Sequence, residues 1–236
     1  LGLDDVDCKE RTPIIYAIKG NFVGCLRVLL EQEEIDINQE YKGNNLLQYA
    51  CLKNQNDVFD VILDSIVFDP NQPCADGRVI LVVAIERNNI HMVKSILDKF
   101  ERSVDVNIDS NGKTPLIIAC EMGEIEIVKL LLSNVSIDSE KPASVDGTTP
   151  FMAAARSGKV ELLKLLIDTE EVDVHQKNKL GMSAIHFAFY AGQIDAVEFL
   201  LPYFIDNLND KTDKGETLLQ IACKRGDIQL SKLLIN

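Results

Sequence analysis

Four residues at positions 111–114, Asn-Gly-Lys-Thr, match the end of a phosphate-binding loop. A complete loop of this kind has a second glycine five residues before Gly112, but this chain has Asn107 there. Because that glycine lets backbone N–H groups surround a phosphate, its absence favours a turn that only stabilises the fold.

Histidine and cysteine side chains, which bind metals and act as bases or nucleophiles, do not cluster in the sequence. The histidines are far apart, and no two cysteines have the CxxC spacing of a metal or redox site. The pattern also lacks a nucleophile–base pair and paired carboxylates. We therefore expect a non-catalytic protein with free thiols and without a metal or cofactor. The residues concerned are His91, His175, His186, Cys8, Cys25, Cys51, Cys74, Cys120 and Cys223.

The 236-residue chain is acidic, with 24 Lys and Arg against 37 Asp and Glu and a net charge of −13 at pH 7. This charge argues against binding of nucleic acid or of an anionic membrane surface. No apolar stretch reaches the ~18 residues of a membrane span, and no signal peptide opens the sequence. We expect a monomer in the cytoplasm, with the nucleus as the alternative. Because the sequence starts at Leu1 and ends within an apolar helical pattern, we also expect a fragment of a longer protein.

Seven anchor residues divide the chain into repeats of similar length. Successive anchors are separated by 33 to 35 residues, and an alanine stands five positions after each one. The pattern predicts a single domain, 1–236, with repeats 7–39, 40–73, 74–108, 109–143, 144–177, 178–211 and 212–236. The anchors are Thr12, Asn45, Val79, Thr114, Thr149, Ser183 and Thr217.

Each repeat carries signals for two helices. Six anchors are Thr, Ser or Asn, whose side chains can accept hydrogen bonds from the free N–H groups at a helix start. Gln48 and Gln220 follow their anchors at the spacing of a capping box. Nine residues after every anchor stands Asn or Gly, which predicts the end of a helix of about two turns. A second, amphipathic helix follows, and a glycine two residues before six of the anchors predicts a tight turn.

A unit of turn, short helix, turn and longer helix, with Thr-Pro-Leu-Ile-Ile-Ala at 114–119 and Thr-Pro-Phe-Met-Ala-Ala at 149–154, resembles the ankyrin repeat. The resemblance covers the full chain. It implies an all-α solenoid of stacked helix-turn-helix units with β-hairpin-like connecting loops. The segment from Val79 lacks both the cap and the proline, and the first repeat has Glu10 where glycine is expected. We therefore expect the helix after Val79 to fray early.

The resemblance also implies structural roles for several polar and small residues. His186 is three residues after its anchor, where ankyrin repeats often carry a histidine that braces neighbouring turns. Asn38 and Asn107 end Asp-x-Asn triplets, and such an asparagine is typically structural in ankyrin repeats, with asparaginyl hydroxylation as the alternative. Three cysteines stand six residues after an anchor, at a position that we expect to be packed: Cys51, Cys120 and Cys223.

Ankyrin proteins usually bind other proteins on a concave side formed by hairpin tips and the ends of the first helices. By this resemblance, five positions of each repeat should be exposed and face the partner: four, three and one residues before the anchor, and seven and eight after it. We call these 35 positions the predicted binding surface. They carry 13 basic and 6 acidic residues, whereas the rest of the chain carries 11 basic and 31 acidic residues.

This reversal of charge predicts that the partner presents an acidic segment or an acidic surface. Apolar side chains among the same positions supply anchors, and Tyr190 with Met182 and Arg156 is the favoured cluster. Three alternatives remain: lysine-rich turns that are merely solvated, a targeting or regulatory ankyrin domain of a larger enzyme or channel, and a nucleic-acid or phosphorylated ligand. The residues predicted to bind are Tyr41, Lys42, Leu52, Lys53, Arg78, Arg87, Lys113, Met122, Arg156, Lys179, Leu180, Met182 and Tyr190.

Overall fold

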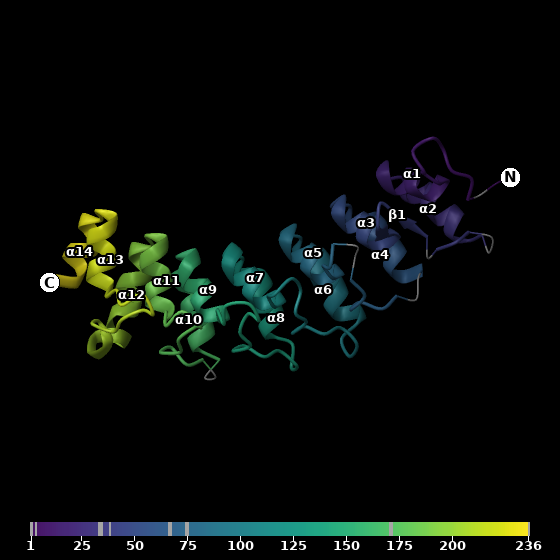
Figure 1. The fold of residues 1–236 in the computed structure, drawn as a ribbon. Helices are drawn as coiled ribbons and strands as arrows, with labels where there is room; N and C mark the ends of the chain where they lie inside the picture. The colour runs from purple at the N-terminus through teal and green to yellow at the C-terminus, as the bar shows by residue number, and fades with distance from the viewer. Residues whose placement is uncertain are drawn as a thin grey trace. The chain divides into compact units, whose positions relative to one another are not determined.

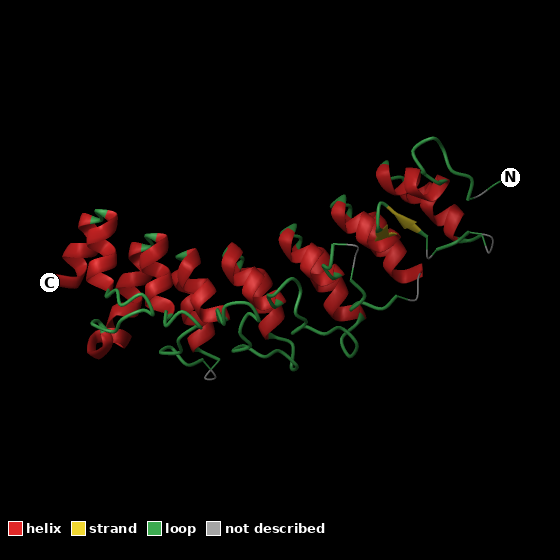
Figure 2. Cartoon of the chain, in the orientation of Figure 1, coloured by secondary structure: helices red, strands yellow, loops and turns green. Residues whose placement is uncertain are grey.

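The computed structural model describes residues 2, 4–32, 35–37, 39–65, 68–73, 76–169 and 172–235. Within these residues the secondary structure is almost entirely helical, with one short two-stranded hairpin (Figure 2). The chain folds into two compact units, Leu1–Asp105 and Val106–Asn236. Asn38, which we expected to be structural, lies outside the described residues.

The Leu1–Asp105 unit consists of three helix pairs (Figure 1). Its first helices, α1, α3 and α5, pack against one another in sequence, and so do its second helices, α2, α4 and α6. A short hairpin of β1 (Glu40–Tyr41) and β2 (Asn44–Asn45) precedes α3, with Glu40 opposite Asn45. The helices are α1 (Pro13–Lys19), α2 (Val23–Leu30), α3 (Leu46–Leu52), α4 (Asn56–Ser65), α5 (Ile80–Glu86) and α6 (Ile90–Lys99).

The Val106–Asn236 unit consists of four helix pairs with the same arrangement. The first helices α7, α9, α11 and α13 form one layer, and the second helices α8, α10, α12 and α14 form the other. The helices are α7 (Pro115–Met122), α8 (Ile125–Leu132), α9 (Pro150–Ser157), α10 (Val160–Ile167), α11 (Ala184–Ala191), α12 (Ile194–Phe204), the 3₁₀ helix η1 (Ile205–Asn207), α13 (Leu218–Arg225) and α14 (Ile228–Ile235).

All seven first helices begin directly after the predicted anchors. Both predicted capping boxes form: the backbone N–H of Gln48 donates to Asn45 and that of Gln220 donates to Thr217, while each glutamine accepts from its anchor's backbone N–H. Thr12 differs, because its hydroxyl donates to Gln39 Oε1 at 2.6 Å instead of capping α1. The predicted helix starts are therefore confirmed, although not every anchor caps through its side chain.

The residue nine positions after each anchor is left-handed in every repeat, as predicted. The first three repeats use asparagine there, with φ between 51° and 58°, and the last four use glycine, with φ between 69° and 78°. Glu10 also has a positive φ, of 57°, at the turn position that is glycine in the other repeats. Asparagine and glycine tolerate this conformation best, so the residues nine positions after the anchors fix where each first helix ends.

The alanine of each repeat lies in the core, with an exposed fraction of 3% or less. A side chain this small lets neighbouring first helices approach closely. Cys51 and Cys120, at the next position, are fully buried, which confirms their packing role. Cys223 is exposed, so our expectation was wrong there. Within the described residues α13 has no following first helix to cover it.

Candidate partner-binding surface

Ion pairs connect the hairpin tips of the predicted binding surface to the ends of the first helices. In each case one partner precedes its anchor by one residue and the other follows it by seven. The pairs are Arg78–Glu86 at 2.6 Å, Lys113–Glu121 at 2.7 Å and Lys224–Glu216 at 2.7 Å. The same contact in three repeats indicates that the two groups of positions lie side by side.

Glu121 holds two cations of this surface. Its carboxylate accepts hydrogen bonds from Lys113 Nζ and from Arg156 Nη2, which comes from the next repeat. The Glu121 side chain is 18% exposed, so these ion pairs are partly shielded from water. Lys113 and Arg156, both predicted to bind the partner, therefore share a carboxylate that offsets part of their charge.

Two other arginines of the surface are also paired with carboxylates. Arg78 contacts Asp76 as well as Glu86, and its guanidinium lowers the pKa of Asp76. Arg11 contacts Asp7, and this contact lowers the pKa of Asp7 well below its ordinary value. These carboxylates neutralise part of the positive charge. The surface therefore presents less positive charge to a partner than the count of basic residues in the sequence indicates.

Three cations at the ends of successive first helices remain available. Lys19 ends α1, while Lys53 and Arg87 are the C-caps of α3 and α5. All three are exposed, and within the described residues none forms an ion pair with a carboxylate. The Lys53 ammonium lies 5.3 Å from the centre of the Tyr49 ring. The negative end of each helix dipole stabilises a cation at these positions, and the Tyr49 ring also attracts Lys53. These cations therefore need no carboxylate partner.

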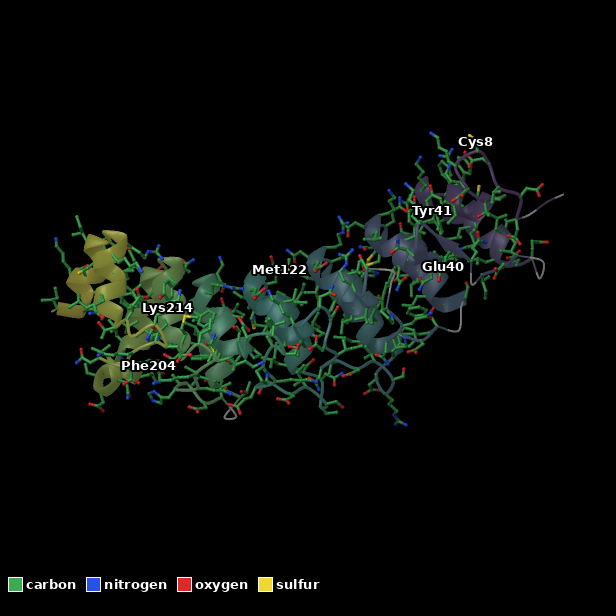
Figure 3. The ribbon with its side chains drawn as sticks, viewed as in Figure 1. Cys8, Glu40, Tyr41, Met122, Phe204 and Lys214 are labelled. Atoms are coloured by element: carbon green, nitrogen blue, oxygen red, sulfur yellow. The ribbon has the colours of Figure 1, made fainter. Side chains whose placement is uncertain are left out.

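Tyr41, which we expected to be exposed, is buried with an exposed fraction of 7% (labelled in Figure 3). Its ring packs edge-to-face on Tyr49, with 5.1 Å between the centroids, and Lys42 covers it at 5.5 Å. Ser110 and Thr148 are also buried, at 4% and 3%. Tyr41 therefore packs beneath the Lys42 side chain and exposes little area that a partner could contact.

The apolar members in the Val106–Asn236 unit are more accessible. Leu180 is 50% exposed, Tyr190 40% and Met122 39%, whereas Met182 is half-buried. In the other unit, Leu52 is half-buried. Tyr190, Met182 and Arg156, the cluster favoured from the sequence, together line a hollow of about 220 Å³. The structure therefore brings these three residues together.

A family model of ankyrin repeats in three copies matches residues 2–74, 62–141 and 134–210. The chain belongs to the ankyrin repeat family. A similar solved structure is the ankyrin repeat domain of Bcl-3, described as a unique member of the IκB protein family. The TM-score is 0.76 at 19% sequence identity, and the alignment covers 96% of this chain and 99% of that one, so the likeness concerns the fold. No curated protein matches the sequence.

His186 is structural, as expected, but it caps its own helix and does not brace a neighbouring turn, because among the described residues its buried Nε2 has no hydrogen-bond partner. Its Nδ1 accepts a hydrogen bond from the Ser183 backbone N–H at 3.2 Å, as the glutamines do in the two capping boxes. The side chain is 2% exposed, and burial lowers its pKa from 6.5 to about 4. His186 is therefore neutral near pH 7 and fixes the start of α11.

Asn107 bridges successive ankyrin repeats through its side chain. Its Nδ2 donates to the Ser136 carbonyl at 2.6 Å, and its Oδ1 accepts from the Asp138 N–H at 2.8 Å. Asn71 makes the matching pair of bonds in the other unit, at 2.7 Å each, to Ser103 and Asp105. We missed Asn71 because it stands eight residues before its anchor, not seven, although it also ends an Asp-x-Asn triplet.

One polar cluster, around Asp60, contains the residue types of a Ser–His–Asp triad but not their order of contacts. Asp60 accepts from Ser95 at 3.3 Å and lies 2.7 Å from His91, so the carboxylate separates the hydroxyl from the imidazole. In the described part of the chain, no three His, Cys, Asp or Glu side chains form a metal-binding group. The helices described there are all too short or too polar to cross a membrane.

Proposed function

We propose that this ankyrin repeat protein binds an extended acidic segment of another protein on its predicted binding surface. Ankyrin repeats are in general non-catalytic modules for protein–protein interaction. The observation that carries the acidic specificity is the set of exposed, unpaired cations Lys19, Lys53 and Arg87 at the ends of α1, α3 and α5. We expect the protein to act as a monomer in the cytoplasm or the nucleus.

The local balance of charge supports this choice of partner. In the Leu1–Asp105 unit the surface carries seven basic and two acidic residues, the latter being Asp76 and Glu86. Arg78 contacts both carboxylates. Arg11 is also paired, with Asp7, and within the described residues the other cations of this surface can attract a carboxylate-rich segment without first breaking an ion pair. Attraction of this kind raises the association rate and weakens with salt.

Charge reversal of the three free cations tests the proposal. The variant Lys19→Glu/Lys53→Glu/Arg87→Glu should bind a fluorescein-labelled peptide of alternating Glu and Ser at least about tenfold more weakly than the wild type. Fluorescence anisotropy at about 0.15 M salt measures this difference. Lys113 and Arg156 are poor targets, because reversing them would place new carboxylates beside Glu121.

A matched control changes the same net charge elsewhere in the same unit. Arg27, Lys94 and Arg102 are exposed and lie outside the predicted binding surface, with Arg27 on α2 and Lys94 on α6. Their simultaneous reversal to Glu should leave the affinity within about threefold of the wild type. Equal loss of binding in the two variants would mean that binding depends only on the net charge of the protein. That result would contradict the proposed surface.

A further inference from the structure

Two apolar hollows lie next to each other on the predicted binding surface of the Val106–Asn236 unit. One, of about 220 Å³, is lined by Arg156, Met182, Phe187, Tyr190 and Ala191. The other, of about 260 Å³, is lined by Leu180, Met182, Tyr190, Thr212, Asp213 and Lys214 (Lys214 is labelled in Figure 3). Met182 and Tyr190 line both, so these two side chains form the wall between the hollows.

Each hollow has room for one side chain and is small for a free ligand. Pockets that hold drug-sized molecules measure about 300–1,000 Å³. Leu180 and Tyr190 are 50% and 40% exposed, which leaves apolar surface that a partner side chain could remove from water. The chemistry of the lining therefore suits a bulky apolar side chain such as leucine.

The wall between the hollows is held in position. The Tyr190 hydroxyl donates to Glu216 Oε2 at 3.2 Å, and Glu216 is also paired with Lys224. The Arg225 guanidinium donates to the carbonyls of Phe189, at 3.3 Å, and Tyr190. Because Tyr190 is already fixed, binding loses less side-chain entropy than binding to a mobile residue would.

For the extended segment of the proposed function, the spacing of the hollows favours polyproline II over a β-strand. The first hollow joins the repeats of Arg156 and Tyr190, and the second joins the repeats of Tyr190 and Lys214, so they are one repeat, ~10 Å, apart. In a polyproline II segment, residues three apart lie on the same side at a separation of ~9 Å. In a β-strand, side chains on one side repeat every two residues, at ~7 Å.

We propose that this unit binds a segment in the polyproline II conformation whose bulky apolar side chains, three residues apart, enter the two hollows. The inference rests on the proposed function and specifies the segment that is bound. Acidic residues should flank the apolar pair. Within the described residues Lys179, Lys214 and Arg225 have no carboxylate within ion-pair distance. Lys214 lines the second hollow together with Asp213, so Lys179 and Arg225 supply the excess of positive charge around it.

Labelled peptides that differ only in the spacing of two leucines test the inference. Their host sequence contains Glu, Pro and Ser, because proline favours polyproline II. The peptide with leucines three residues apart should bind about tenfold more tightly than the leucine-free host and than peptides with leucines two or seven residues apart. If the peptide with spacing two binds as tightly as the peptide with spacing three, the bound segment is a strand. If the peptide with spacing seven does so, the bound segment is a helix. Either result would overturn the inference.

Variants of the hollows provide the second part of the test. Tyr190→Ala and Leu180→Ser, both at exposed positions, should remove most of the tenfold gain that the leucine pair adds over the leucine-free host, with both affinities measured on the same variant. Tyr203→Ala is the matched control, because Tyr203 is 42% exposed but lies on α12, outside the predicted binding surface. It should keep the gain. Circular dichroism checks that each variant is folded.

The two proposals fail in different ways. If the wild type does not bind the leucine-free acidic host, the acidic partner of the proposed function is wrong. If it binds the host but gains nothing from the leucine pair, or keeps the gain after Tyr190→Ala, only the two-hollow inference is wrong.

Discussion

Glu121 reduces the positive charge that Lys113 and Arg156 present in the Val106–Asn236 unit. Lys113 and Arg156 both contact its carboxylate, although they lie in different repeats. Because the pair of cations is held by one anion, the cluster keeps a net positive charge but presents less of it than its sequence count indicates.

Removing the Glu121 charge should strengthen binding of an acidic segment. For Glu121→Gln we expect the alternating Glu and Ser peptide to bind about threefold more tightly by anisotropy, with a loss of stability of at most ~1 kcal/mol. Glu126→Gln is the control, because Glu126 pairs with Lys129 at 2.9 Å on α8, away from the surface. Tighter binding in both variants to the same extent would contradict a local role for Glu121.

His186 should make the stability of the protein depend on pH. Burial is the main cause that lowers its pKa from 6.5 to about 4, nearby Lys177 lowers it further, and Asp210 opposes the shift. The unfolded chain therefore binds a proton below about pH 6.5 that the folded chain does not. The stability linked to His186 is fully present above that pH and is lost as the pH falls toward 4.

The substitution His186→Gln isolates this effect, because glutamine occupies the same position in the capping boxes of Asn45 and Thr217. Between about pH 7 and about pH 5 the wild type should lose ~1–2 kcal/mol of unfolding free energy more than the variant does. Urea denaturation at the two pH values measures it. Parallel losses in both proteins would mean that His186 does not titrate as we expect.

Among the first helices, α5 follows the one anchor that has no polar side chain to cap it, Val79. Val79 precedes it without a side-chain hydrogen bond, whereas Thr114 and Thr149 each accept one, at 3.3 Å, from the residue three positions on. The core residues of α5 are almost fully buried, so packing holds a helix that its cap does not support.

Supplying the missing cap should stabilise α5. For Val79→Thr we expect a gain of ~1 kcal/mol in unfolding free energy and slower hydrogen exchange of the α5 amides. Val79 is 3% exposed, as Thr114 is, so a threonine fits the same environment. In the unaltered protein, α5 amides should exchange faster than those of α9. Hydrogen exchange that shows α5 to be the most protected helix would refute the prediction.

At the scale of the whole chain, basic residues concentrate at the positions of the predicted binding surface. The predicted binding surface carries 13 basic and 6 acidic residues, and the rest of the chain carries 11 and 31. A partner with a short acidic segment meets mainly the first group, whereas a long polyanion also meets the acidic remainder. We therefore expect the protein to prefer acidic peptides to nucleic acid.

Duplex DNA should therefore compete poorly for this surface. At about 0.15 M salt we expect a random-sequence duplex not to displace the labelled Glu and Ser peptide at concentrations at which the unlabelled peptide does. Competition anisotropy distinguishes the two cases. Efficient displacement by DNA, lost steeply as salt is added, would favour a nucleic-acid ligand instead.

The sequence alone determined the local features of the ankyrin fold. The starts of the first helices, the capping boxes and the left-handed residues at their ends follow from interactions among residues only a few positions apart. The alanine positions followed from the period of the repeats, because every unit packs its neighbours through the same site. These features could be predicted from residue types and spacing.

Tertiary structure decided which residues of the predicted binding surface are available. Glu121 binds Arg156 from 35 positions away, which no spacing within one repeat could indicate. Tyr41 is buried against Tyr49, Asn71 bridges to the next repeat from a shifted position, and the hollows beside Tyr190 lie between repeats. Ion pairing and burial depend on side chains that the stacking of repeats brings together, so they were settled only by the three-dimensional arrangement.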